Sequence, residues 1–334
     1  MKNSCLLLLV LSLLILSGCA DEDKLIERDF SVKGMTFKMA IPQGGMSSLE
    51  IMKLADKAEK SAESRLDLFW GDKSELAKLQ EGNGTLNVSP ELYSVLEDAL
   101  YLYQQSDSLW HPLLGSLETA WMDKGKNDRE TAVPELLNAI KESHLTLKGS
   151  GAIDKGGSAR ISLRRMAIGY ALDGAVLALK IGGAQSGMIT VLDLTAVWGR
   201  KTKAEEWSFQ IFSPSSGDSA YYLFKPPAGV FCIINGTENP AKGAPMLISP
   251  ETGYPHESTS IVVGWNPSAV MAGGYAEAGM LMGRKEMFSM VRNSPPSDSI
   301  GILFLYPDGD QYLLETDLIL SETVTFETVE PDEE

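Results

Sequence analysis

Cys19 is the residue of this chain whose chemistry can be read most directly from its neighbours. It closes the tetrapeptide Leu16–Cys19, which reads Leu-Ser-Gly-Cys and follows Lys2 and a mainly apolar run over residues 5–16. A charged start, an apolar middle and a small-residue cleavage site are typical of a secretory signal. A cysteine directly after Leu-Ser-Gly indicates a bacterial lipoprotein signal, in which cleavage precedes the cysteine and acyl chains are attached to its thiol.

Two other interpretations of this segment remain open: an ordinary signal peptide with a coincidental cysteine, and an N-terminal membrane helix. The apolar core is shorter than the roughly 20 residues that span a bilayer. We therefore expect residues 1–18 to be a signal peptide and residues 19–29 to be a lipidated tether on the extracytoplasmic (periplasmic) face of a bacterial membrane. The residue after the cysteine is Ala20. An aspartate there would signal retention in the inner membrane, so alanine favours the outer membrane.

The rest of the sequence contains few patterns that indicate catalysis. The three histidines, His111, His144 and His256, are far apart, and no His or Cys spacing typical of a metal site occurs. Neither a Gly-x-Ser-x-Gly elbow nor a Walker phosphate loop is present. Residues 155–158, Lys-Gly-Gly-Ser, can hold an anion on their amides, but they are more typical of a plain connection.

Charge and cysteine content exclude further classes. The net charge is −16, and the absence of a basic stripe argues against a nucleic-acid partner. With Cys19 lipidated, only Cys232 remains in the mature chain, so no intramolecular disulfide is possible. Cys232 lies in an apolar, strand-like run, which favours a buried, inert thiol over a nucleophile. Residues 321–334 are expected to form a solvated acidic tail.

Apolar periodicity predicts the elements that must position any site. Ser48 is the expected cap of a helix that buries Ile51 to Leu66, and Ser89-Pro90 starts another helix. Ala269–Met282 is a predicted helix whose internal glycines indicate a close approach. Further helices are expected at 133–142 and 171–180, a loop at 148–157, and strands at 30–41, 145–147, 160–163, 188–194, 208–212, 230–234, 260–263 and 300–306. This order predicts an α+β fold over residues 30–320, with a mixed or antiparallel β-sheet core and flanking helices.

A series of short motifs along residues 30–305 carries a family resemblance. They are residues 34–37, 73–79, 110–117 with Trp121, 167–173, Trp207 with 211–214, 248–255, and the helix 272–283. In order and spacing, and behind a lipoprotein signal, they resemble the FAD:protein FMN transferases, formerly called thiamine-biosynthesis lipoproteins. The resemblance also implies the α+β fold.

The resemblance implies a specific reaction. The family binds FAD and Mg²⁺, breaks the pyrophosphate, and joins FMN through its phosphate to a Thr or Ser of a partner flavoprotein. Mg²⁺ neutralises charge on the pyrophosphate oxygens and is generally held by one or two carboxylates together with phosphate oxygens. The family supplies its carboxylate, and a Thr four residues later, from one face of a helix near the C-terminus.

This chain departs from the family pattern at the positions that hold ligand. Gly273 stands at the metal-binding Asp, Glu277 at its Thr partner, Ser162 at the Asp of Asp-Leu-Gly-Gly, and Arg164-Arg165 at the glycine pair. Other changed positions are Ile168, Met246, Ser249, 192–194 and 234–236. The matches that survive, at turn and packing positions, are Gly115, Gly169, Tyr170, Asp173, Pro250, Thr252 and Gly253.

The sequence leaves three functional interpretations. The loss of so many chemical positions favours a degenerate, weakly active or inactive transferase that is retained to bind a flavoprotein or complex subunit. The first alternative is an active enzyme with a rebuilt site. There, Glu277 holds the metal and the flavin or phosphate pocket is drawn from Arg164, Arg165, Gly169, Tyr170, Asp173, Thr252 and Gly253. The second is an unrelated solute- or partner-binding lipoprotein, but the chain lacks the doubled lobe pattern this needs.

Overall fold

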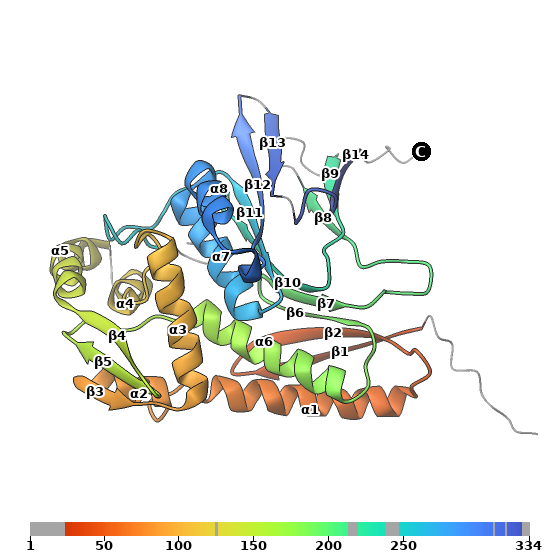
Figure 1. Ribbon diagram of the computed structural model, residues 1–334, viewed down its shortest axis with the longest axis horizontal. Coiled ribbons are helices and arrows are strands. Elements are labelled where there is room, and N and C mark those ends of the chain that lie inside the picture. The colour runs from red at the N-terminus through yellow and green to blue at the C-terminus, as the bar shows by residue number, and fades with distance from the viewer. Residues whose placement is uncertain are drawn as a thin grey trace, which may run out of the picture.

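An eight-stranded sheet forms the centre of the computed structural model, which describes residues 24–123, 126–212, 220–237, 247–309, 311–317 and 319–328 (Figure 1). Its order is β1-β2-β6-β7-β10-β11-β12-β13, and every neighbouring pair is antiparallel. These strands are β1 Leu25–Val32, β2 Met35–Pro42, β6 Gly187–Val191, β7 Leu194–Trp198, β10 Gly229–Asn235, β11 Ile261–Asn266, β12 Gly301–Asp308 and β13 Gln311–Thr316. The predicted α+β class is therefore confirmed.

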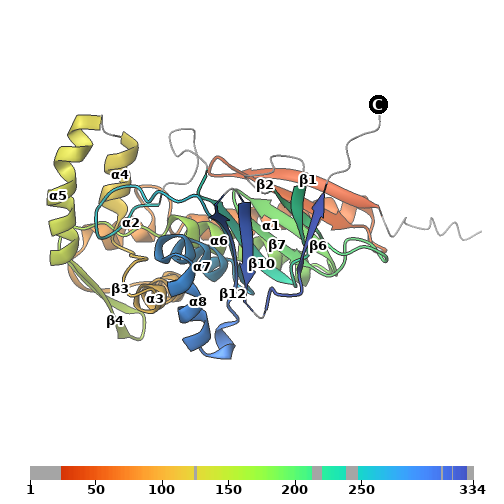
Figure 2. The same cartoon turned by 90° about the horizontal axis from the view of Figure 1, so that it is seen from above.

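Two three-stranded sheets and eight helices of the described residues complete the fold. The small sheets are β14-β9-β8, from Val324–Thr328, Ala220–Phe224 and Phe209–Phe212, and β3-β5-β4, from Gly84–Asn87, Ala152–Gly156 and His144–Gly149. The helices are α1 Ser48–Leu66, α2 Glu75–Glu81, α3 Pro90–Gln105, α4 Gly115–Asp123, α5 Lys126–Glu142, α6 Arg164–Ile181, α7 Ala269–Met282 and α8 Arg284–Asn293. Seen from above, α4 and α5 stand at the end away from the large sheet (Figure 2). None of the described helices has the length and apolarity to cross a bilayer.

The large sheet is covered on both faces, and β10 shows how its sequence achieves this. Val230, Cys232 and Ile234 belong to the core beneath the helices, whereas Phe231 belongs to a second core beneath the small sheet β14-β9-β8. Because side chains alternate across a strand, one apolar run can serve both cores. Cys232 is fully buried, as its neighbours predict.

The predicted strand over residues 30–41 is wrong in one respect, because it is half of a hairpin. β1 ends at Val32 and β2 begins at Met35, and both turn residues, Lys33 and Gly34, have positive φ. Such a two-residue turn matches the twist of the flanking strands. β1 begins at Leu25, so the end of the predicted tether 19–29 is part of the sheet, where pairing with β2 satisfies its backbone groups.

Strand pairing explains three further corrections. The predicted strand 188–194 runs from β6 through a turn to the first residue of β7, and the predicted loop 148–157 contains all of β5. The predicted tail 321–334 contains β14, which pairs with β9. Residues 160–163 form no strand, and the helix predicted over 171–180 begins earlier, at Arg164.

Helix starts follow local hydrogen bonding. α1 begins one residue earlier than predicted, because Ser47 rather than Ser48 caps it and Glu50 completes a capping box. The predictions of α3 from Ser89-Pro90 and of α7 over Ala269–Met282 are confirmed.

Candidate functional site

The candidate site lies where α6 meets α7, and Gly169 sets how closely they approach. A Cβ at Gly169 would lie only 2.5 Å from the carbonyl oxygen of Ala269 at the start of α7. Only glycine permits this contact without moving backbone. One turn later on α6, the Asp173 carboxylate accepts hydrogen bonds from the Ala269 amide at 2.9 Å and the Ser268 hydroxyl at 3.0 Å. Burial raises the pKa of Asp173, and these hydrogen bonds oppose the shift. Both residues therefore anchor α7.

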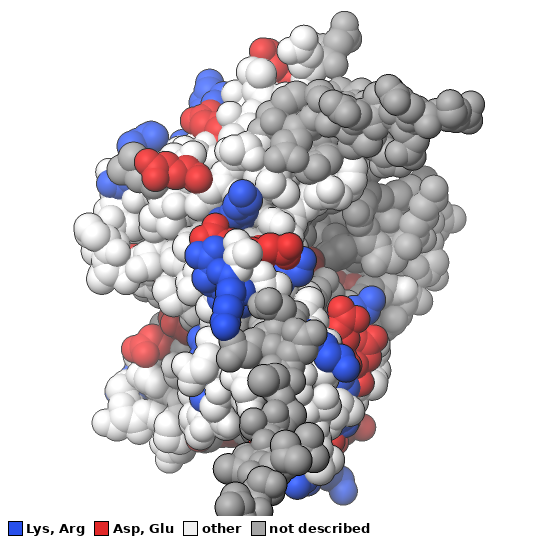
Figure 3. Space-filling view, turned by 90° about the vertical axis from the view of Figure 1, so that its right-hand side faces the viewer, with Lys and Arg blue, Asp and Glu red and all other residues white. Residues whose placement is uncertain are grey.

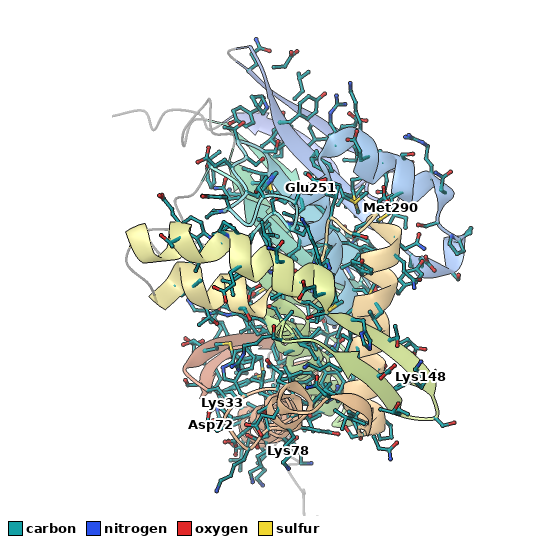
Figure 4. The ribbon with its side chains drawn as sticks, turned by 90° about the vertical axis from the view of Figure 1, so that its left-hand side faces the viewer. Lys33, Asp72, Lys78, Lys148, Glu251 and Met290 are labelled. Carbon is teal, nitrogen blue, oxygen red and sulfur yellow. The ribbon has the colours of Figure 1, made fainter. Side chains whose placement is uncertain are left out.

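We expect Asp173→Ala to lower the free energy of unfolding by about 2 kcal/mol, because it removes the cap of α7 and leaves a buried amide unpaired. Asp72, an exposed loop residue labelled in Figure 4, supplies the control Asp72→Ala, which should change stability by less than about 0.5 kcal/mol. Urea unfolding of both variants measures the difference. Equal stability of the two variants would contradict the anchoring role of Asp173.

Arg165 is the centre of the candidate site. Its guanidinium, on the first turn of α6, forms ion pairs with Asp193 in the turn after β6 and with Glu277 on α7. The side chains of the three residues are 9%, 16% and 14% exposed, so the cluster is largely withdrawn from water. Trp110 donates from Nε1 to the second oxygen of Glu277 at 2.7 Å. Glu277 is thus fully engaged by protein groups.

Gly273 makes room for the arginine. A Cβ at Gly273 would lie 2.9 Å from Cγ of Arg165 and 3.0 Å from its Cδ. The stem of Arg165 therefore fills the space into which a side chain at position 273 would project. The two positions are complementary, because the absence of a side chain at Gly273 leaves the space that the Arg165 stem occupies.

The residues present do not fit a divalent metal at this position. The Arg165 guanidinium lies between Asp193 and Glu277. It neutralises the negative charge of the two carboxylates, which a bound metal ion would otherwise require. Burial lowers the pKa of Arg165, but the nearby carboxylates of Glu277 and Asp193 together raise it by more than burial lowers it. The net shift is upward, so the guanidinium stays charged. Within the described ranges, no three His, Cys, Asp or Glu side chains are grouped to hold a metal ion. Burial raises the pKa of the adjacent Cys232 thiol, so it is no anionic ligand.

A cavity of about 310 Å³ opens on the other side of the first turn of α6. Its wall includes side chains able to contact a polar ligand, namely Gln80, Glu118, Thr119, Arg160, Ser162 and Arg164, with Phe69 and Trp70 as the aromatic part. Ser162 donates to the Glu118 carboxylate, whose oxygens lie 2.7 and 2.8 Å away. Burial raises the pKa of Glu118, and the Ser162 hydrogen bond opposes it. Oε1 of Gln80 is buried without a hydrogen-bond partner among the described residues.

The structure distributes the sequence-predicted pocket residues over several places. Arg164 lines the cavity and is exposed, while Arg165 lies in the ion-pair cluster. Tyr170 stacks beneath the Arg65 guanidinium at 4.3 Å, and its carbonyl accepts from Arg65 at 3.1 Å. Thr252 and Gly253 belong to a separate turn, which α4 and α5 contact.

The geometry of that turn explains why Thr252 and Gly253 occur there. Gly253 has a φ of +74°, and a Cβ there would lie 2.7 Å from Val133. Its carbonyl accepts from Trp121 Nε1 at 2.8 Å, and Thr252 Oγ1 accepts from the Tyr254 amide at 3.3 Å. Met246, at a changed family position, lies outside the described residues.

Two site residues were not singled out by the sequence. Glu118 contacts Ser162, and Trp110 contacts Glu277. Both lie within or directly after the motif 110–117, so their place in that motif was the available signal.

The fold matches solved structures of flavin transferases. The flavin transferase ApbE from Vibrio cholerae superimposes with a TM-score of 0.74 at 16% identity, covering 90% of this chain and 99% of that one. The apo form of flavinyl transferase ApbE from Pseudomonas stutzeri gives 0.71 at 17% identity, covering 90% and 96%. The ApbE protein from Thermotoga maritima gives 0.68 at 17% identity, covering 90% and 99%. At such identities the likeness establishes the fold alone.

Sequence comparison establishes the family. No curated protein sequence matches this chain significantly. The model of the ApbE family matches residues 34–300, most of the chain and nearly all of the region that carries the motifs. The chain belongs to the ApbE family.

Proposed function

We propose that this protein is an extracytoplasmic, lipid-anchored member of the ApbE family that has lost metal-dependent flavin transfer and is retained to bind a flavoprotein or complex subunit. The solved relatives are named as flavin transferases, which supplies the reaction from which this chain diverged. The anchor rests on the signal that ends at Cys19.

One observation carries the loss of metal-dependent transfer. Arg165 lies between Asp193 and Glu277 with its stem against Gly273, so a fixed protein cation stands at the position where the family resemblance implies Mg²⁺. A guanidinium cannot exchange ligands with pyrophosphate oxygens while two carboxylates hold it. Charge neutralisation by a metal is the contribution that such a reaction needs most.

A second candidate, an active transferase with a rebuilt site, is supported by the cavity beside α6. Arg160 and Arg164 line it together with an aromatic wall, a combination that suits a phosphate attached to a planar ring. The carboxylate in that lining is Glu118, which already accepts a hydrogen bond from Ser162.

Calorimetric titration with Mg²⁺ and FAD separates these candidates. We expect no Mg²⁺ binding to the wild type and FAD binding that is weak or absent and does not change on adding Mg²⁺. The variant Arg165→Gly/Gly273→Asp removes the cation and adds a carboxylate beside Asp193 and Glu277, so it should acquire Mg²⁺ binding.

The control is Arg164→Gly/Gly273→Asp, which adds the same carboxylate but leaves Arg165 in place, and it should not bind Mg²⁺. Tight FAD binding by the wild type that depends on Mg²⁺ and is lost in Glu277→Ala would overturn the proposal in favour of the rebuilt site.

A further inference from the structure

Two pairs of exposed apolar side chains lie at one end of the molecule. Leu49 and Met52, on the first turns of α1, are 65% and 37% exposed. Leu177 and Ile181, one turn apart at the end of α6, are 48% and 78% exposed. The two helix ends are adjacent, because a Cβ at Gly182 would lie 2.2 Å from Leu54 of α1. We name these four residues the apolar end.

The core does not account for the apolar end. The buried stripe of α1 consists of other residues, beginning with Ile51 and Leu54, and α6 buries Ala175 and Leu179 in its last turns. The exposed leucine, methionine and isoleucine side chains on these adjacent helix ends therefore form an apolar surface outside the core, a feature that marks an interaction site.

The N-terminal segment leaves the fold at this same end. The Gln43 amide donates to the carbonyl of Lys24 at 2.8 Å, and residue 43 leads through a short loop into α1. Figure 1 shows the start of β1, the start of α1 and the end of α6 on its right-hand side, and that side faces the viewer in Figure 3. Only four residues lie between Cys19 and Lys24, and the five chain steps that join these two residues span at most about 18 Å.

We propose that the apolar end docks on the lipid surface beside the anchor. The proposal rests on lipidation of Cys19, because acyl chains at Cys19 hold this end within one short tether of the bilayer. Apolar side chains on helix ends partition into the headgroup region, about 5–10 Å deep. Lys53, which is exposed, adjoins Met52 and can extend toward lipid phosphates. The docked body presents the cavity and the β4–β5 hairpin away from the membrane, toward a protein partner.

Site-directed fluorescence on the full lipidated chain tests this orientation. Cys232 is fully buried and Cys19 is acylated, so a cysteine introduced at the surface is the accessible thiol of the mature protein. The nitrobenzoxadiazole label is attached at Ile181→Cys, at Leu49→Cys and, as control, at Lys148→Cys. Lys148 is exposed on β4, at the opposite end, which Figure 4 views. Each protein is reconstituted into vesicles of phosphatidylethanolamine and phosphatidylglycerol.

We expect brominated lipid to quench the labels at 181 and 49 by about half and the label at 148 by less than about a tenth, since quenching requires insertion to the acyl boundary. Membrane-bound protein whose labels at 181 and 49 are unquenched would overturn the docked surface while leaving lipidation intact. Quenching at all three positions would overturn the orientation.

Incorporation of labelled palmitate and alkaline washing of the vesicles test the anchor separately, with Cys19→Ala as the unlipidated control. A wild type without label that washes off the vesicles would refute lipidation and, with it, the docked surface. Shielding of the label at 181 in native membranes but not in protein-free vesicles would assign the apolar end to a protein partner and overturn the lipid proposal.

Discussion

Arg165→Met is expected to destabilise the protein by about 3–5 kcal/mol, the usual cost of removing one partner from a buried ion pair. The substitution keeps a long side chain against Gly273 but leaves the carboxylates of Asp193 and Glu277 without their shared cation. Hydration cannot compensate, because both carboxylates are largely buried. The measurement is the free energy of unfolding from urea titration.

Arg164→Met is the matched control. Arg164 precedes Arg165 on the same helix turn but is exposed, so its loss should change stability by no more than about 0.5 kcal/mol. The triple variant Arg165→Met/Asp193→Asn/Glu277→Gln should recover much of the lost stability, since no buried charge is then left unpaired. If Arg165→Met is as stable as Arg164→Met, the cation does not hold the site together.

Flavin transfer is expected to be undetectable when the protein is mixed with FAD, Mg²⁺ and a threonine-containing acceptor domain encoded in the same genome. Transfer requires a neutralised pyrophosphate and an aligned acceptor hydroxyl, which are matters of electrostatics and positioning. Loss of one such electrostatic contact commonly costs about 3–4 kcal/mol of barrier, or several hundredfold in rate. Here the stem of Arg165 lies against Gly273, the position at which the family resemblance implies a metal-binding carboxylate, and its guanidinium pairs with Glu277.

Mass spectrometry of the acceptor provides the readout, as a mass gain of one FMN. The flavin transferase ApbE from Vibrio cholerae, tested with its own acceptor, is the positive control for the assay. A gain of one FMN that depends on this protein and survives purification would refute the non-catalytic proposal. Glu118→Gln and Arg164→Met would then show whether the cavity beside α6 has become the catalytic site.

Elements with strong local signals were predictable from sequence. The helix α7 was placed at its observed bounds. The start of α3 followed from Ser89-Pro90, because a serine cap followed by proline is a signal carried by adjacent residues. One hairpin was missed because its turn lacks a typical signal. The turn between β6 and β7 uses Leu192 at a φ of +52°, a conformation for which glycine is the usual residue, so the run 188–194 reads as one strand.

The sequence by itself determined the family, the α+β class, the candidate lipidation signal and the identity of the changed positions, because each depends on residue type and order along the chain. Only the tertiary structure decided what the changes mean together. Residues 165, 193 and 277 are far apart in sequence, yet packing of α6 against α7 and β7 brings a cation between two carboxylates and places its stem on Gly273. A charge and the space that receives it lie on different elements, so their complementarity arises only when the chain folds.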